Sequence, residues 1–163
     1  MDQLMPVVGT TALLGSALVG GIFFAFSSFV MKALSRLPAA EGIAAMQSIN
    51  VVVLNPSFLG AFMGTAILSL GAVVLAAVGW GRPPAPFLIG GAIFYLVGTF
   101  LVTALGNVPL NDQLAALSVN DAGAAEMWDR YLTRWTAWNH VRTVAAMVAA
   151  LLYTLSLIQG GRA

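Results

Sequence analysis

Four long runs of hydrophobic residues dominate the pattern of the chain. They cover residues 7–34, 54–78, 87–105 and 136–158, and a helix needs about 20 residues to cross the hydrocarbon core of a membrane. The first run is too long for a cleaved signal peptide, so we expect it to stay as a span. The pattern predicts an all-α membrane protein, in which residues 1–163 form one domain, an antiparallel bundle of four transmembrane helices.

The segments between these runs indicate the topology. Residues 79–86 are rich in Gly and Pro and predict a tight turn between the second and third spans. The connections 35–53 and 106–135 are longer and carry most of the polar residues, and both must leave the bundle on one face. We therefore predict two extramembrane helical connections on that face, and both chain termini on the other.

Local sequence signals predict where several helices begin and end. Pro38 precedes a helix start in the first connection, and Asn55-Pro56 opens the second span, because Pro fits a first helical turn. Gly106-Asn107 predicts the end of the third span. Ser118 and Asp121 resemble a capping box, and the helix that they start should continue unbroken into the fourth span.

Composition supports the assignment to a membrane. Hydrophobic residues make up 60% of the chain, charged residues 8%, and the mean hydropathy is +0.91, whereas a soluble domain has roughly 25% charged residues. We expect a multi-pass integral membrane protein, in the cell membrane if the source is bacterial. The net charge of +1 argues against nucleic acid as a partner. Most Lys and Arg residues lie towards the polar face, which favours a cytoplasmic location for it.

The start of the fourth span carries the candidate catalytic residues, which are Asn139, His140 and Arg142. His140 is the only histidine, and ionisable side chains at a span are usually functional. At about 100° per residue, His140 and Arg142 point roughly 160° apart, so one should face a ligand while the other serves structure. Trp135 and Trp138 either belong to an interfacial aromatic belt or form the wall of a cavity.

Amide side chains are the second candidate group, and all of them lie on the polar face. Each could cap a helix or a turn, but together they could bind the oxygens of a flat phenolic or quinonoid molecule. Four phenylalanines of the first span could add an aromatic wall. The candidate substrate-binding residues are Gln47, Asn50, Asn55, Asn107, Asn111, Trp135, Trp138, Phe24 and Phe26.

Metal and cofactor chemistry finds little support in the sequence. The chain has one histidine and no cysteine, and its carboxylates are scattered, which is not a convincing ligand set for zinc, copper or iron. We expect no metal and no cofactor, with molecular oxygen as a co-substrate. Haem bound through His140 is the alternative.

Four ordered sequence blocks resemble the anthrone oxygenase-like family of small four-helix membrane proteins. The blocks are residues 21–31, 46–50 with Asn55-Pro56, 106–111, and the Trp-x-x-Trp-Asn-His-x-Arg segment at 135–142. The resemblance covers nearly the whole chain and implies oxidation of an anthrone to an anthraquinone. For that reaction His140 could be the general base, and Asn139, Asn50, Asn107 or Arg142 could stabilise the enolate.

Two other classes of function stay open beside the enzyme. The protein could bind or move a lipophilic small molecule without chemistry, or it could be a structural or assembly protein of the membrane. The expected partners are the lipid bilayer and a lipophilic aromatic small molecule. Small residues recur four positions apart in the first span, at Ala12, Ser16 and Gly20, and in the second, at Gly60 and Gly64. This spacing would allow close helix packing, within one chain or between copies in a homo-oligomer.

Overall fold

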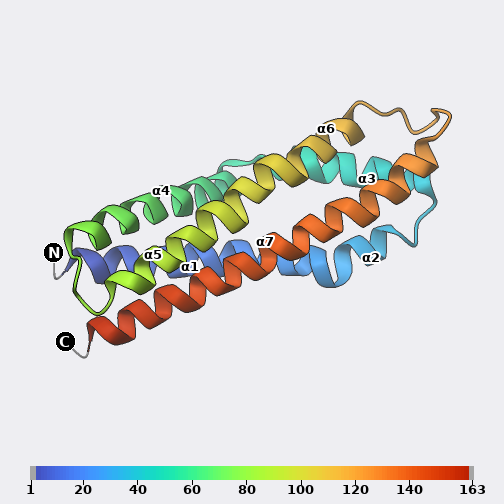
Figure 1. Cartoon of the computed structure of the whole chain (residues 1–163). Coiled ribbons are helices and arrows are strands. Elements are labelled where there is room, and N and C mark those ends of the chain that lie inside the picture. The colour runs from blue at the N-terminus through green and yellow to red at the C-terminus, as the bar shows by residue number, and fades with distance from the viewer. Residues whose placement is uncertain (1–2, 162–163) are drawn as a thin grey trace.

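The computed structural model describes residues 3–161, which form long helices and no strand (Figure 1). The first membrane-length helix comprises α1 (Leu4–Ala25), the π-helical turn η1 (Phe26–Val30) and α2 (Met31–Leu34). The second is α4 (Pro56–Val78). The third comprises α5 (Ala85–Ile93), η2 (Phe94–Leu101), η3 (Thr103–Asn107) and α6 (Val108–Ala115), and the fourth is α7 (Ala124–Gly160).

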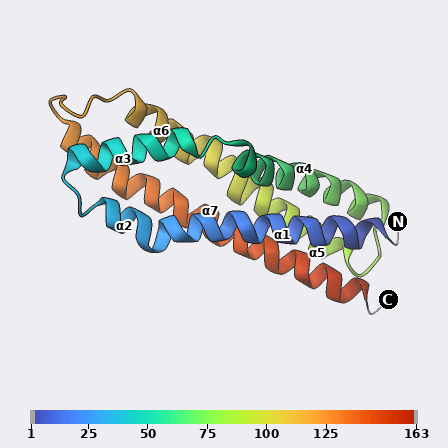
Figure 2. The same cartoon turned by 180° about the vertical axis from the view of Figure 1, so that it is seen from behind.

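These four helices are long and apolar enough to cross a membrane, which confirms the predicted all-α bundle. They run antiparallel in sequence order, and the N- and C-terminal ends lie at the same end of the molecule (Figures 1 and 2). The shorter helix α3 (Ala39–Val52) lies at the other end, beside α6 and the beginning of α7. We call this the polar end, and it carries both long connections as predicted.

Helix starts at the polar end follow the sequence signals. Helix α3 begins directly after Pro38, whose backbone is extended. Helix α4 begins with Pro56 in its first turn, and the side chain of Asn55 accepts a hydrogen bond of 3.0 Å from the backbone N–H of Phe58. This bond satisfies a donor that the first turn of a helix otherwise leaves free.

The predicted end of the third helix is wrong. The helix does not stop at Gly106-Asn107 but continues through η3 and α6 to Ala115. Pro109 lacks the N–H of a regular helix, and its ring clashes with the preceding turn of an α-helix. The π-helical segment η3 ends just before Pro109, and its wider backbone lets the chain pass the proline without a break.

The capping box of Ser118 and Asp121 does not start a helix. The Asp121 carboxylate accepts a hydrogen bond of 2.8 Å from the Ser118 backbone N–H, which closes a turn instead. Helix α7 begins after Gly123, whose φ of +89° favours glycine. The helix then runs unbroken for 37 residues, as predicted, so at 1.5 Å per residue it extends well beyond a hydrocarbon core of about 30 Å.

Two hydrophobic clusters stabilise the bundle, and a layer of buried polar side chains lies between them. The larger cluster joins the four helices in their membrane-spanning part. The smaller one joins α2, α3, α6 and the first turns of α7 at the polar end. The polar layer contains Ser27, Thr99, Asn107, Asn139 and Arg142, all of them buried or partly buried.

The small residues of the first span pack inside the chain. Ala12 and Ser16 have no exposed surface, and a Cβ added to Gly20 would lie 3.2 Å from the Cβ of Ala146 in α7. In α4, by contrast, a Cβ added to Gly60 or Gly64 would meet nothing within 4 Å. Contact between copies through Gly60 and Gly64 therefore stays a prediction.

Candidate functional site at the polar layer

One face of α7 points into the bundle at the polar end. Its buried residues follow each other three or four positions apart, the spacing of a single helix face, and include Trp128, Tyr131, Trp135, Asn139 and Arg142. The inward face of α7 therefore carries three aromatic residues in series, followed by Asn139 and the buried cation Arg142.

Arg142 lies at the centre of the polar layer, and only 6% of its surface is exposed. Its Nε donates a hydrogen bond of 2.9 Å to Oδ1 of Asn139, and one terminal nitrogen donates a long bond of 3.4 Å to the Thr103 hydroxyl. The guanidinium carbon lies 3.8 Å from the ring centre of Phe23 and 4.8 Å from that of Trp135. Such cation–π contacts stabilise a buried cation by about 2 kcal/mol.

No carboxylate balances this charge. Within residues 3–161, no Asp or Glu lies within the 4.0 Å of Arg142 that an ion pair requires, and the ion pair found there joins Arg130 to Glu126 on the exposed surface of α7. An Arg side chain keeps its proton in proteins. The polar layer therefore holds a positive charge that has polar and aromatic neighbours but no counter-ion.

Asn139 fixes the position of the guanidinium. Its side chain is fully buried and uses both ends. The carbonyl oxygen accepts the bond from Arg142, while the amide nitrogen donates to the backbone oxygen of Phe23 at 2.8 Å and to the Ser27 hydroxyl at 2.7 Å. Because these acceptors belong to α1 and the π-helical turn η1, Asn139 connects Arg142 rigidly to the first helix.

A cavity of about 180 Å³ lies directly beside Arg142. Helices α1, α3, α4 and α7 and the segment η3–α6 all contribute to its wall. The cavity thus lies at the polar end, between α7 and the two connections, as predicted. The wall is mainly aromatic and aliphatic, and its polar side chains are Asn50, Thr103, Asn111 and Arg142.

A hydrogen-bond network forms the outer part of this wall. Oδ1 of Asn111 accepts bonds from the Tyr131 hydroxyl at 2.9 Å and from the indole N–H of Trp135 at 2.7 Å. The Asn50 amide donates to the same Tyr131 hydroxyl at 3.4 Å. The rings of Trp128, Tyr131 and Trp135 stack in series, with centres 5.6 and 5.9 Å apart. The network therefore holds Trp135 in place beside Arg142.

Five of the predicted site residues line the cavity: Phe26, Asn50, Asn111, Trp135 and Arg142. Asn139 lies behind Arg142 and holds it. The structure thus brings together half of the predicted set and leaves the other half elsewhere.

Three predicted amides have structural positions instead. Gln47 donates to the backbone oxygens of Leu114 and Leu117 and thereby joins α3 to the end of the third helix. Asn55 caps α4. Asn107 is fully buried and donates to the backbone oxygen of Trp135, while its own carbonyl oxygen has no partner. None of the three lines the cavity.

His140, Trp138 and Phe24 face outwards, contrary to the prediction that they line the site. Trp138 is 44% and Phe24 56% exposed, and His140 is exposed as well, on the other flank of α7 from Trp138. His140 follows the inward-facing Asn139, and one residue turns a helix by about 100°. The imidazole therefore does not share the inward face with Asn139 and Arg142, and it does not line the cavity beside Arg142. The role of His140 as general base stays a prediction, and this position does not support it.

Helix α4 supplies cavity residues that the sequence analysis missed. Phe58 and Phe62 lie one helical turn apart with stacked rings, their centres 5.8 Å apart, and both contact Phe23 edge-on. Thr103, from η3, is a polar cavity residue that the sequence analysis also missed. The spacing of Phe58 and Phe62 by four residues was the available signal, and only the position of α4 beside α1 makes it informative.

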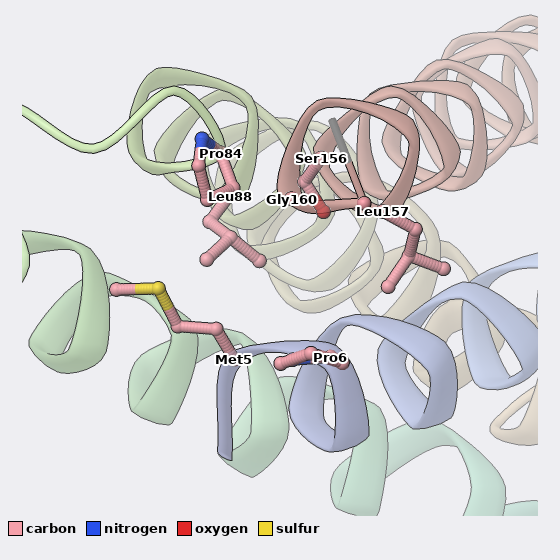
Figure 3. A pocket seen from close by; sticks show the side chains of 8 residues that line it. Met5, Pro6, Pro84, Leu88, Ser156, Leu157 and Gly160 are labelled. Atoms are coloured by element: carbon pink, nitrogen blue, oxygen red, sulfur yellow. The ribbon is translucent and has the colours of Figure 1, made fainter. Parts of the chain in front are cut away.

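A second cavity lies at the opposite end of the molecule, near the two termini (Figure 3). Its volume is about 190 Å³, and Met5, Pro84, Leu88 and Leu157 contribute to its wall. The one hydroxyl there, from Ser156, donates to the backbone oxygen of Tyr153. None of the residues 3–161 that line this cavity has an ionisable side chain, so this part of the wall offers no group for acid–base chemistry or for binding charge.

Comparison with known proteins agrees with the resemblance seen in the sequence. The family model described as anthrone oxygenase matches residues 57–152, which is more than half of the chain and includes α4, the third helix and most of α7. No curated protein and no solved structure matches the chain. The matched region includes Thr103, Asn111, Trp135, Asn139 and Arg142. The chain belongs to the anthrone oxygenase family.

Proposed function

We propose that this membrane protein oxidises a lipophilic phenolic substrate of the anthrone type with molecular oxygen, in the cavity beside Arg142. The observation that supports this most is the position of Arg142, a buried cation without a counter-ion at the wall of an aromatic cavity. A flat aromatic molecule can lie against the rings of Phe58, Phe62 and Trp135 while one of its oxygens faces the guanidinium.

The main task of the protein in this reaction is to stabilise the carbanion of the substrate. Loss of a proton from the methylene carbon of an anthrone to water gives an enolate, whose negative charge lies largely on the oxygen. Arg142 stabilises that oxyanion, and Asn139 keeps the guanidinium in place. Fixed donors of this kind act strongly where water is excluded, and each is worth about 10²–10³-fold in rate.

Oxygen then reacts at the carbon of the enolate. One electron passes from the enolate to O₂, and the two radicals combine to a peroxide anion on the former methylene carbon. This anion takes a proton back from water and becomes a hydroperoxide. Loss of water leaves a carbonyl group, so the balance is one CH₂ group plus one O₂ giving one C=O group and one H₂O. In this proposal the enolate reduces oxygen directly, and no bound metal or cofactor takes part.

The test uses purified protein in detergent with emodin anthrone and O₂, and it corrects for the rate without protein. Formation of the quinone should match O₂ consumption one to one. Arg142→Gln should lower kcat by about 10²–10³-fold, since it removes the oxyanion donor, and a metal chelator should not change the rate. His140→Gln is the control and should retain wild-type activity.

Three results would contradict the proposal. These are no acceleration above the protein-free rate, full activity in a folded Arg142→Gln variant, and loss of activity on chelation. Saturable binding of the anthrone without quinone formation would instead indicate a protein that binds or moves lipophilic molecules.

A further inference from the structure

We infer that the cavity binds its aromatic ligand as an anion, an ionised phenol or enol, and thereby shifts the ionisation of that ligand to lower pH. The inference rests on the proposed function only for the aromatic class of the ligand. In this view no base of the protein removes the proton inside the cavity. The positive charge of Arg142 favours the deprotonated form of the ligand instead.

The charge balance of the polar layer is the first argument. A buried charge without a partner is unfavourable, and the loss is largely recovered when an opposite charge approaches it. Arg142 donates one short bond, to Asn139, and one long bond, to Thr103, although a guanidinium has several further donors. An anion in the adjacent cavity would give these donors a charged acceptor.

Among residues 3–161, no other formal charge contacts the guanidinium. The helices packed against it contribute Phe23 and Ser27 from the first helix, Thr103 from the third, and Asn139 and Trp135 from α7. Tyr131 is the one other ionisable group that interacts with Arg142, and its hydroxyl donates to Asn111. An anionic ligand in the cavity would therefore be the counter-ion of Arg142.

The absence of a base from the cavity wall is the second argument. Among the described residues, the wall contains amides, a hydroxyl and Arg142 but no carboxylate, imidazole or lysine. Asn111 can add a second donor, because Tyr131 and Trp135 occupy its oxygen while its nitrogen has no partner in residues 3–161. The wall can thus donate hydrogen bonds to an oxyanion, whereas it has no good acceptor for a substrate proton.

The experiment measures the ionisation of a bound phenol whose anion has its own absorption band. We suggest 4-nitrophenol, titrated against the wild-type protein in detergent without O₂, with empty micelles as blank. The anion should bind at least about tenfold more tightly than the neutral phenol, so that the midpoint of the bound probe falls by at least about one pH unit. The anion band should then appear at a pH where the free probe is neutral.

Three variants test the origin of this shift. Arg142→Gln should abolish it, and Asn139→Asp should reduce it strongly because the new carboxylate would pair with the guanidinium. Arg134→Gln removes an exposed arginine of the same helix and should leave the shift unchanged. 4-Nitroanisole, which cannot ionise, should bind wild type and variants equally and so show that the cavity is intact.

An unchanged midpoint in the wild type, or a shift that survives in Arg142→Gln and Asn139→Asp, would overturn the inference. Because no oxygen is consumed, this result is separate from the test of catalysis. A protein that shifts the probe but does not oxidise emodin anthrone would contradict the proposed oxidation alone. A protein that oxidises the anthrone without shifting the probe would contradict anion recognition alone.

Discussion

Individual buried polar groups of this protein are positioned by bonds from neighbouring helices. Asn111 is the clearest case, because one carbonyl oxygen accepts from both the Tyr131 hydroxyl and the Trp135 indole. Tyr131 and Trp135 are almost fully buried. A buried donor without an acceptor costs about 1–3 kcal/mol, so a single amide satisfies two groups that would otherwise oppose folding.

Replacement of this amide should therefore destabilise the protein. Asn111→Leu keeps a similar volume but removes the acceptor of both donors, and we expect a loss of roughly 2–4 kcal/mol in the free energy of unfolding. Reversible denaturation in detergent measures it, with Gln113→Leu at an exposed position of the same helix as control.

A double variant separates this cause from altered packing. Adding Tyr131→Phe to Asn111→Leu removes one of the two stranded donors, so part of the lost stability should return. A double variant that is less stable than the sum of both single changes would contradict the assigned role of Asn111.

At the scale of elements, α3 closes the polar end over the cavity. Gly42 lets it approach α7 closely, since a Cβ at this position would lie 2.8 Å from the Trp128 ring. Gln47 joins it to the end of α6, and Met46, Ile49 and Asn50 form part of the cavity wall. The position of this short helix therefore determines the shape of the site.

Gly42→Ala should loosen α3. The Trp128 ring is buried and has little space to move, so we expect overpacking to cost about 1–3 kcal/mol. Limited proteolysis between α2 and α3 should become faster, and ligand binding in the cavity should weaken. Gly64→Ala is the matched control, because its new methyl group meets nothing within 4 Å. Equal behaviour of the two variants would show that α3 does not depend on this contact.

For the whole molecule, the arrangement of the helices separates two ends with different chemistry. The polar end has long connections, exposed charges and the cavity with Arg142. The other end has the Pro-rich turn, both terminal regions and a cavity whose lining, as far as the structure describes it, has no ionisable side chain. If the proposed oxidation is correct, a lipophilic substrate would meet Arg142 at the polar end of the bundle.

Cysteine labelling should place these two ends on opposite sides of the membrane. The chain has no cysteine of its own, so Ser118→Cys at the polar end and Trp80→Cys in the turn give single labels at exposed positions. An impermeant reagent added to intact cells should reach only Trp80→Cys, because the positive-inside rule favours a cytoplasmic polar end. Labelling of both from one side would contradict four crossings.

Much of the fold follows from the sequence alone. The lengths of the hydrophobic runs predict the four spans, Pro38 and Asn55-Pro56 mark helix starts, and the Pro-rich turn defines the hairpin. These are local properties, because each depends on the backbone of a few neighbouring residues or on the thickness of the bilayer. There are two exceptions. The π-helical segments of the third helix carry it past Asn107 and Pro109, and the capping box of Ser118 and Asp121 closes a turn instead of starting α7.

The site was decided by tertiary structure. Lipid is as apolar as the interior of the bundle, so hydrophobicity does not reveal which face of a membrane helix points inwards. The sequence could show that His140 and Arg142 point apart, but only the packing of α7 against α1 places Arg142 inside and His140 outside. The packing of α3 and α6 at the polar end likewise makes Asn50 and Asn111 part of the cavity wall, whereas Gln47 and Asn107 bond to backbone oxygens of neighbouring helices.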